Sequence, residues 1–215
     1  PLSAVYSRYS DATQRSTHEP VLLERHCLPP ETAREVFALY REYHGPLSIF
    51  SDGRSYLDGA GMALFQDRHI QRHSTEDGRT HVVRDLDEWM SRHAHEVEKF
   101  CMFFDSIEIA QAALVRFRAF PGIEAVQGAP DNVEVTAAGV DKGTALLALA
   151  DWLGIPREAT LAIGDSDNDR AMLARAGVAA VMANALPEIR ALGDIVSTRD
   201  NDHDGVAELF ERLGL

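Results

Sequence analysis

The sequence predicts an α/β protein made of two parts, a first half with an antiparallel sheet and a second half with a parallel sheet flanked by helices. Two patterns support this prediction. From residue 141 to the C-terminus, helical and strand patterns alternate, which is the order that builds parallel sheets. Between residues 99 and 136, an apolar strand, a helix and a hairpin follow one another, which indicates a small α+β domain.

The composition is that of an ordinary globular protein. The chain has 215 residues, 45% of them apolar and 26% charged, which is enough to bury a substantial core. Its net charge of −13 argues against a nucleic-acid partner, because phosphates require a basic face. The sequence has only two cysteines, without a paired spacing, and shows no N-terminal signal and no apolar run of membrane-spanning length. We therefore expect a cytoplasmic protein without a membrane partner.

The first half opens with two short strands, expected at residues 2–6 and 21–24. A helix should start near Pro30, because proline is tolerated in the first helical turn. Its inward face is predicted from residues at helical spacing, namely Ala33, Val36, Phe37 and Tyr40. Strands at residues 47–51 and 55–57 then form a hairpin around an Asp-Gly turn.

Residues 59–98 contain most of the histidines, among many charged residues. His93 and His95 suggest a metal site at first sight, but side chains two positions apart on a helix point to different faces. We therefore predict a solvated, variable region here, and the sequence leaves the role of the histidines at positions 69–95 open. The strand, helix and hairpin of residues 99–136 follow, and the first half as a whole is interpreted as a lid or recognition domain.

The second half starts with a helix that Asp141 is expected to cap. An apolar stripe predicts which of its side chains point inward, namely Leu146, Leu149, Ala150 and Leu153. A buried strand is expected at residues 159–163, followed by a helix at 167–176 that ends at Gly177 in a left-handed cap.

The remaining elements continue the alternation. A strand is expected at residues 178–182, a helix opens at 184–187, and a short strand follows at 194–196. The last helix should cover residues 205–213. Its predicted inward side chains are Val206, Leu209, Phe210 and Leu213.

Acidic and amide side chains gather directly after the strand at 159–163, at Asp165, Asp167, Asn168 and Asp169. Open α/β sheets bind ligands at the carboxyl ends of their strands, and Mg²⁺ there takes one or two carboxylates together with phosphate and water. The alternative interpretation is an acidic turn that caps a helix, since the same residue types are favoured for capping alone. A magnesium site is therefore one of two explanations at this point.

Lys142 lies in the first turn of its helix, where the helix dipole mildly disfavours a cation. It is either an exposed lysine that tolerates this cost or a fixed cation for a phosphoryl group. The spacing does not decide between the two interpretations.

Several segments together resemble the haloacid dehalogenase superfamily, and most closely its Cof-like sugar-phosphate phosphatases, which carry a large α/β cap. The matching segments are residues 139–146, 162–169, 172–173, 176–177, 182–185 and 201–206, with the end of the cap at 132–136. The resemblance implies a partial Rossmann-like core and an α+β cap with an antiparallel sheet. The expected division is a short core remnant or linker at 1–18, the cap at 19–137 and the C-terminal part of the core at 138–215.

The resemblance also implies roles for individual residues. Lys142 corresponds to the lysine that steadies the phosphoryl group, and Asp165 corresponds to the carboxylate ligand of Mg²⁺, the expected cofactor. Asn168 corresponds to a residue near the phosphate or the metal waters, and Asp169 orients its neighbours, including the lysine. Asn132 and Glu134 lie where the family's cap faces the active site. A small phosphorylated metabolite is the expected substrate, and its identity cannot be read from the sequence.

One part of the family pattern has no counterpart in the sequence. In the family, a first strand that ends in Asp-x-Asp-Gly-Thr carries the aspartate nucleophile and the general acid/base. The nearest similar segment, residues 50–54, has Phe50 in the nucleophile's place and lies inside the cap. We therefore expect a phosphatase by ancestry that is inactive as this chain alone.

Two further hypotheses stay open beside the phosphatase. The chain could be a remnant that binds a phosphorylated ligand or a partner without catalysis, or a phosphomutase of the same superfamily, which would need the same aspartate. For this chain we also expect an unsatisfied sheet edge beside residues 159–163, filled by rearrangement, by the N-terminal residues or by another molecule, the last of which would include self-association.

Overall fold

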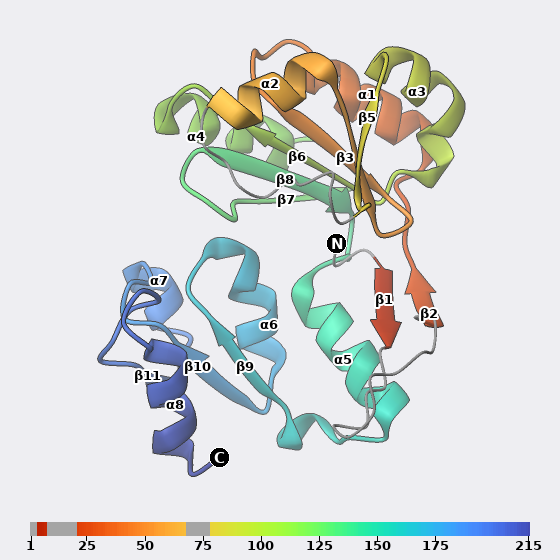
Figure 1. The fold of residues 1–215 in the computed structure, drawn as a ribbon. Coiled ribbons are helices and arrows are strands. Elements are labelled where there is room, and N and C mark those ends of the chain that lie inside the picture. Colours follow the sequence, from red (N-terminus) through yellow and green to blue (C-terminus); the bar gives the residue numbers. More distant parts are fainter. Residues whose placement is uncertain (1–3, 8–20, 68–77) are drawn as a thin grey trace. The chain divides into compact units, whose positions relative to one another are not determined.

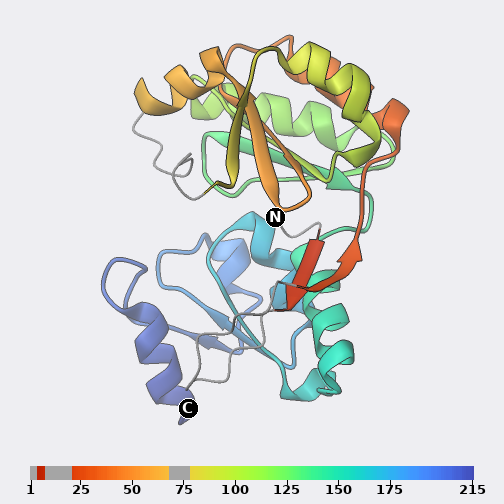
Figure 2. The same ribbon diagram turned by 45° about the vertical axis from the view of Figure 1, so that its right-hand side comes forward.

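The computed structural model describes residues 4–7, 21–67 and 78–215, and its contacts divide the chain into two compact units. The first unit is Pro1–Ala125 with Pro130–Val140, and the second is Val126–Ala129 with Asp141–Leu215. Figures 1 and 2 show the elements of both. Each unit is described here by itself, and the domain boundary expected at residues 137–138 stays a prediction.

The first unit is built on a six-stranded sheet in the order β5-β4-β3-β6-β8-β7. Its strands are β3 (Leu47–Ser51), β4 (Arg54–Asp58), β5 (Thr80–Val83), β6 (Lys99–Phe103), β7 (Ile123–Val126) and β8 (Asn132–Ala137). The β3–β4 hairpin is antiparallel, as predicted, and the β3–β6 and β6–β8 pairs are antiparallel too, whereas β4 and β5 are parallel. A separate antiparallel pair joins β1 (Ala4–Ser7) to β2 (Val21–Arg25).

Three helices cover one face of this sheet around a single hydrophobic core. They are α1 (Pro30–Tyr40), α3 (Leu86–His93) and α4 (Ile107–Arg118), and Figure 1 shows α1 and α4 along the sheet. The inward face predicted for α1 is confirmed, because all four of its residues are buried. Tyr40 shows how the core is closed: its ring packs on Phe100 and Phe117, and its hydroxyl donates to the Val133 carbonyl at 3.1 Å.

The prediction of a solvated region at residues 59–98 is wrong. This stretch contains α2 (Gly59–Asp67), β5, α3 and the short 3₁₀ helix η1 (Ala94–Glu96). Three of its rings pack in a row with Tyr56 of β4: His81 lies on Tyr56, Tyr56 on Trp89 and Trp89 on His93, with centroids 4.7–5.3 Å apart. The many charges concealed this packing, because their side chains lie on the outer faces of the same elements. Residues 69 and 73 lie outside the described part of the chain.

The second unit is built on a three-stranded parallel sheet in the order β11-β10-β9. The strands are β9 (Leu161–Gly164), β10 (Val178–Val181) and β11 (Ile195–Val196). The helices are α5 (Lys142–Leu153), α6 (Arg170–Arg175), α7 (Pro187–Arg190) and α8 (Gly205–Leu213), with 3₁₀ helices η2 (Arg157–Ala159) and η3 (Asp167–Asp169). The predicted alternation of helices and strands is therefore confirmed.

Two hydrophobic clusters show that this sheet has helices on both faces. On one face, Ala162 and Val181 pack with residues of α6 and α7, and Leu146 of α5 lies against them. On the other face, Ala180 and Met182 pack against α8. None of the helices in the described part of the chain is long and apolar enough to cross a membrane.

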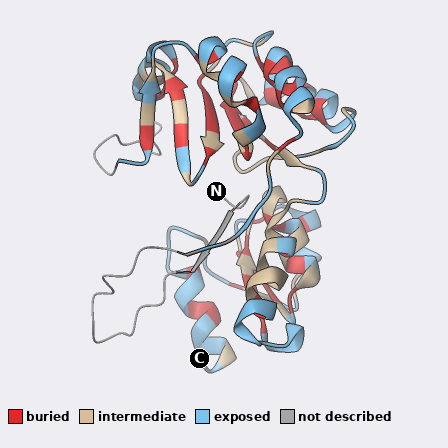
Figure 3. Cartoon of the chain, turned by 90° about the vertical axis from the view of Figure 1, so that its right-hand side faces the viewer, coloured by how far each residue is buried: buried red, intermediate tan, exposed pale blue. Residues whose placement is uncertain are grey.

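The inward faces predicted for the two outer helices are only partly confirmed. In α5, Ala150 is buried, but Leu153 is 46% exposed. In α8, Leu209 is buried, but Val206 and Phe210 are 45% and 41% exposed. Figure 3 shows α8, the helix next to the C-terminus, as pale blue over most of its length with one buried band. The reason is the narrow sheet, since a helix can bury apolar side chains only where a strand lies beneath them.

The left-handed cap predicted at Gly177 is also wrong. The α6 helix ends at Arg175, and the residue after it, Ala176, has an extended conformation. Arg157 binds the last carbonyls instead: its Nε donates to the Arg175 oxygen at 2.6 Å and its Nη2 to the Ala176 oxygen at 3.4 Å. Gly177 is required for a different reason, because a Cβ there would lie 2.5 Å from the Arg157 oxygen.

In the part of the chain that the structure describes, β9 is paired on one side only, with β10. Thr160 and Gly164 direct their carbonyls to the N–H groups of Val178 and Met182. Because successive residues of a strand direct their backbone groups alternately to its two sides, those of Leu161 and Ile163 point away from β10. The unpaired edge predicted for this strand is therefore found.

Candidate active site

The acidic turn lies directly after β9 and is held together by one buried carboxylate. Asp169 is 5% exposed, and its Oδ2 accepts hydrogen bonds from the backbone N–H groups of Asp165 and Ser166, at 3.0 and 3.3 Å. Hydrogen bonds of this kind stabilise the charged form of a buried carboxylate. Asp169 therefore fixes the path of the turn in addition to offering a charge.

Gly164 explains how Asp169 can approach the end of β9 so closely. A Cβ at position 164 would lie 2.5 Å from the Cβ of Asp169 and 2.8 Å from its Oδ2. Such distances are far inside van der Waals contact, so an alanine would displace the carboxylate. The glycine is thus required by the close approach of the two chain segments.

Lys142 reaches this carboxylate from the start of α5. Its Nζ lies 2.5 Å from Asp169 Oδ1 and 3.1 Å from Asn168 Oδ1. Its side chain is 24% exposed and that of Asp169 is 7% exposed, so water screens the pair only in part. The structure therefore brings together Lys142, Asn168 and Asp169, three of the four predicted site residues.

Asp165, the fourth predicted residue, adjoins the same turn but has a different partner. Its Oδ2 accepts a hydrogen bond from Asn184 Nδ2 at 2.7 Å, and Asn184 Oδ1 in turn accepts one from the Asn201 N–H at 3.1 Å. The Asn201 donor fixes which end of the Asn184 amide faces Asp165. The turn after β10 and the loop before α8 thus orient the side chain of Asp165.

The sequence interpretation did not assign Asn184 or Ser166 to the site. Ser166 Oγ donates to Asn168 Oδ1 at 3.0 Å and so holds the amide oxygen that also faces Lys142. Both residues stand at ends of parallel strands, which is a signal that could have identified them. Their side chains support the predicted residues and do not replace any of them.

The charges of the turn are unevenly balanced. Lys142 pairs with Asp169, and the exposed Arg170 pairs with Asp167 at 3.1 Å. Asp165, by contrast, is held by the neutral amide of Asn184. Three carboxylates and two cations leave this half-buried turn with a net negative charge. A bound cation or a further positive group would be stabilised there.

The residues fit Mg²⁺ as one part of its ligand set. Within the described residues, no group of three or more His, Cys, Asp or Glu side chains is arranged to hold a metal ion. Mg²⁺ does not need such a group, because it keeps several waters and takes one or two carboxylates with substrate phosphate. Asp165 can supply one carboxylate oxygen, and any second protein ligand must come from outside this turn.

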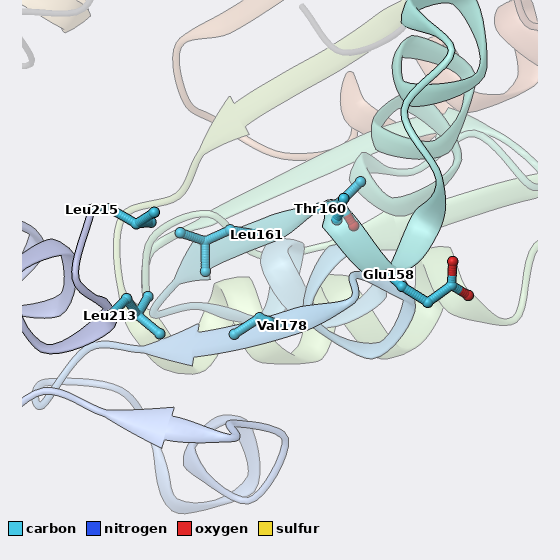
Figure 4. Close-up of a pocket in the computed structure, with 7 residues that line it drawn as sticks. Glu158, Thr160, Leu161, Val178, Leu213 and Leu215 are labelled. Carbon is cyan, nitrogen blue, oxygen red and sulfur yellow. The ribbon is translucent and has the colours of Figure 1, made fainter.

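A cavity of about 260 Å³ lies at the opposite end of the sheet from this turn. Figure 4 shows it beside Leu161 and Val178, the first residues of β9 and β10, and beside Leu213 and Leu215 at the C-terminus. The parallel strands run away from this cavity toward the acidic turn. Its lining is mainly apolar, so it is not part of the candidate active site.

Comparison with known proteins gives consistent results. The family model for haloacid dehalogenase-like hydrolases matches residues 16–210. Phosphatase YwpJ of Bacillus subtilis is 38% identical over 114 residues, which is 53% of this chain and 39% of YwpJ. The HMP-PP phosphatase of Cronobacter sakazakii is 33% identical over 166 residues, which is 76% of this chain and 57% of that protein.

A solved structure has the same fold. It is a subclass IIB sugar phosphatase of the haloacid dehalogenase superfamily, with a TM-score of 0.71 and 20% identity over 90% of this chain and 70% of that one. The chain thus spans about half the length of the curated relatives it matches, 39% of one and 57% of the other. Since the family match extends over nearly all of its residues, the chain belongs to the haloacid dehalogenase-like hydrolases.

Proposed function

We propose that the protein is a Mg²⁺-dependent phosphatase of small phosphorylated metabolites, of the sugar-phosphate class, acting in the cytoplasm. The observation that carries this proposal is the partly buried Lys142, held by Asn168 and Asp169 in the turn that also contains Asp165. A fixed cation in the same turn as a carboxylate that can bind a metal ion suits the charge of a phosphoryl group. The names of the two curated relatives support the same reaction class.

Each residue receives a role from its contacts. Lys142 stabilises negative charge on the phosphoryl oxygens, and Asp169 holds its ammonium group in place. Asn168 presents an amide whose oxygen faces Lys142, which leaves its NH₂ group for a phosphate oxygen or a metal-bound water. Asp165 is the metal ligand, oriented by Asn184. When bound, Mg²⁺ supplies further neutralisation of the phosphoryl charge.

We further propose that the reaction needs a second carboxylate, the nucleophile that forms an aspartyl-phosphate in this family, and that this chain alone is inactive. Lys142 donates hydrogen bonds to Asn168 and Asp169. The carboxylate of Asp169 also accepts hydrogen bonds from the backbone N–H groups of the turn, so it is not placed as a nucleophile. A strand added to the open edge of β9 would end beside Asp165, because parallel strands end at the same edge of a sheet. Such a strand is the proposed source of the nucleophile.

The second candidate function is binding of a phosphorylated ligand without catalysis. The observation that favours it is that Asp169 is already bonded to Lys142 and to the backbone of the turn, so that Lys142 and Asn168 remain as binding groups with no nucleophile assigned beside them in the described part of the chain. The two candidates differ in turnover and not in ligand class.

Hydrolysis of an aryl phosphate, measured with and without Mg²⁺, tests the proposal. The chain alone should show no turnover. A version extended by a relative's Asp-x-Asp strand segment should show Mg²⁺-dependent turnover. In that extended version, Asp165→Asn and Lys142→Met should each reduce kcat about 10²-fold or more, as expected for loss of a preorganised electrostatic group.

Three outcomes would contradict parts of this proposal. Turnover by the chain alone that Asp165→Asn abolishes would refute the inactivity. Turnover by the extended version that is independent of Mg²⁺ would refute the metal role of Asp165. A folded extended version that binds phosphate without hydrolysing it would favour the second candidate.

A further inference from the structure

Three consecutive residues at the start of α5 each contact the segment formed by η3 and α6. Asp141 pairs with Arg175, Lys142 reaches Asn168 and Asp169, and Gly143 lies against the backbone of Ala171. A Cβ at position 143 would be 2.4 Å from the Ala171 oxygen and 2.9 Å from Arg175 Cδ. The beginning of α5 is therefore held at three points spread along the neighbouring segment.

The Asp141–Arg175 contact is the one with directional geometry. Arg175 Nη1 donates to Asp141 Oδ1 at 2.9 Å, and Nη2 donates to Oδ2 at 3.0 Å, so both planar groups face each other in a fork. The Asp141 side chain is 16% exposed and that of Arg175 is 38% exposed. A two-bond contact of this kind fixes orientation as well as distance, which a single lysine contact does not.

The same carboxylate also begins α5. Asp141 Oδ1 accepts from the Thr144 N–H at 2.7 Å, and Thr144 Oγ1 accepts from the Asp141 N–H at 3.0 Å, which completes a capping box. Asp141 is thus bound by its own helix on one side and by Arg175 of α6 on the other. Lys142 follows it directly, in a turn where the helix dipole disfavours its charge. Its position has to be set by neighbours.

We infer that Arg175 is a positioning residue for Lys142. Arg175 binds the carboxylate of Asp141 and thereby fixes the start of α5, so that Lys142 lies opposite Asp169. This inference rests on the proposed role of Lys142 at the phosphoryl group. The two hydrogen bonds of the Arg175 guanidinium described above both run to Asp141, and not to Asp165 or Asn168. Its effect on the site is therefore transmitted through the helix start.

The competing explanation is that Arg175 only stabilises the packing of α5 on α6. Gly143 already allows the close approach of the two helices, and a packing role alone would change stability without changing the Lys142 ammonium group. A measurement made on Lys142 itself separates the two explanations. It needs no enzymatic turnover, so its outcome does not depend on whether the phosphatase proposal holds.

The composition of the chain makes such a measurement direct. Lys99 and Lys142 are its two lysines, beside 19 arginines. With lysine labelled by ¹⁵N at Nζ, the ammonium spectrum contains two signals. Lys99 is the internal reference, because it pairs with Glu134 in the first unit at 3.3 Å. Proton exchange of each ammonium group with water is then compared within one sample.

We expect Arg175→Met to raise the exchange rate of the Lys142 ammonium group at least about threefold relative to Lys99, the change expected when a partly exposed ion pair is lost. Asp141→Ser keeps an N-cap oxygen but removes the fork, and should give the same change. The double variant should show no further increase, because both substitutions remove one and the same contact. Thermal unfolding of each variant confirms that it is folded.

Arg170→Met is the matched control, because it removes the same charge from the same helix and its guanidinium pairs with Asp167. It should change the Lys142 exchange rate less than Arg175→Met does. An equal effect of the control would mean that charge alone matters. An unchanged Lys142 signal in folded Arg175→Met and Asp141→Ser variants would assign Arg175 to packing alone. Either result would overturn the inference.

Discussion

At the scale of single residues, one carboxylate of α8 holds the loop that leads into this helix. Both oxygens of Glu208 accept from the Thr198 N–H, each at 3.0 Å, and Oε2 also accepts from the Arg199 N–H at 2.9 Å. These bonds, first of all the one from the Thr198 backbone, lower the pKa of Glu208 from 4.5 to about 2. The side chain therefore stays charged at pH values where an unfolded glutamate is protonated.

This shift predicts a pH dependence of stability. The contribution of Glu208 to the free energy of unfolding is fully present above pH 4.5 and is lost as the pH falls toward 2, because the unfolded state then binds the proton more readily. Glu208→Gln should lower stability at pH 7 and flatten the fall in stability between pH 4.5 and 2. Urea unfolding at a series of pH values measures both effects.

Glu211→Gln is the control for this prediction, because Glu211 is an exposed carboxylate on the same helix. It should keep both the stability at pH 7 and the acid dependence of the unsubstituted chain. A Glu208→Gln variant that retains the full acid dependence would show that other carboxylates cause it.

At the scale of elements, the packing of α5 on α6 depends on a glycine. Replacing Gly143 by alanine would place a Cβ 2.4 Å from the Ala171 oxygen, a backbone atom that cannot turn aside. We expect Gly143→Ala to lower the free energy of unfolding by about 1–3 kcal/mol, the usual cost of overpacking. Chemical denaturation monitored in the second unit measures this change.

Gly59→Ala is the matched substitution, because its Cβ meets nothing within 4 Å and its backbone is not left-handed. It should be neutral or slightly stabilising, since alanine has the higher helix propensity. If both variants lost the same stability, the close approach of α5 and α6 would not be the cause.

The sequence was sufficient to predict the buried face of a helix where the helix's own apolar residues decide which side chains are buried. Ala33, Val36, Phe37 and Tyr40 mark the inward face of α1, because a helix over a wide sheet buries every residue of its apolar stripe. The same rule failed for Val206 of α8, whose burial depends on how many strands lie beneath the helix. That number is a property of the whole sheet and cannot be read from one helical stripe.

The candidate site shows the same division. Lys142, Asp165, Asn168 and Asp169 could be named because their types and spacing match a family pattern. Asn184 and Arg175 could not, since they act through partners 19 and 34 positions away in the sequence. Contacts of this kind become visible only when the strand ends and helix starts are placed in space.

At the scale of the whole molecule, the edge of β9 that faces away from β10 is unpaired among the residues that the structure describes. Natural edge strands are usually protected by charged residues, proline or a bulge. The sequence of β9, Leu-Ala-Ile-Gly, has none of these, and Leu161 and Ile163 are only half-buried against the α8 side of the sheet. Its composition is that of an interior strand, which is covered on both sides.

This edge predicts self-association. A second copy of the chain can pair its own β9 with the N–H and carbonyl groups of Leu161 and Ile163 that face away from β10 and have no strand beside them among the described residues, and such pairing would also cover their side chains. We expect dimers or larger species at micromolar concentrations, measured by sedimentation velocity. Leu161→Lys should weaken this association about tenfold or more, because pairing would bring together two buried ammonium groups.

The control is Val115→Lys, which makes the same change in charge at an apolar side chain that is 72% exposed on α4, in the first unit. It should leave the association unchanged. A chain that stays monomeric at every concentration would exclude pairing between copies.

In that case, the extended version proposed above offers the second test: a strand that belongs at this edge should raise the free energy of unfolding of the second unit. Without such an increase, the edge of β9 would not be where a strand carrying the proposed nucleophile binds.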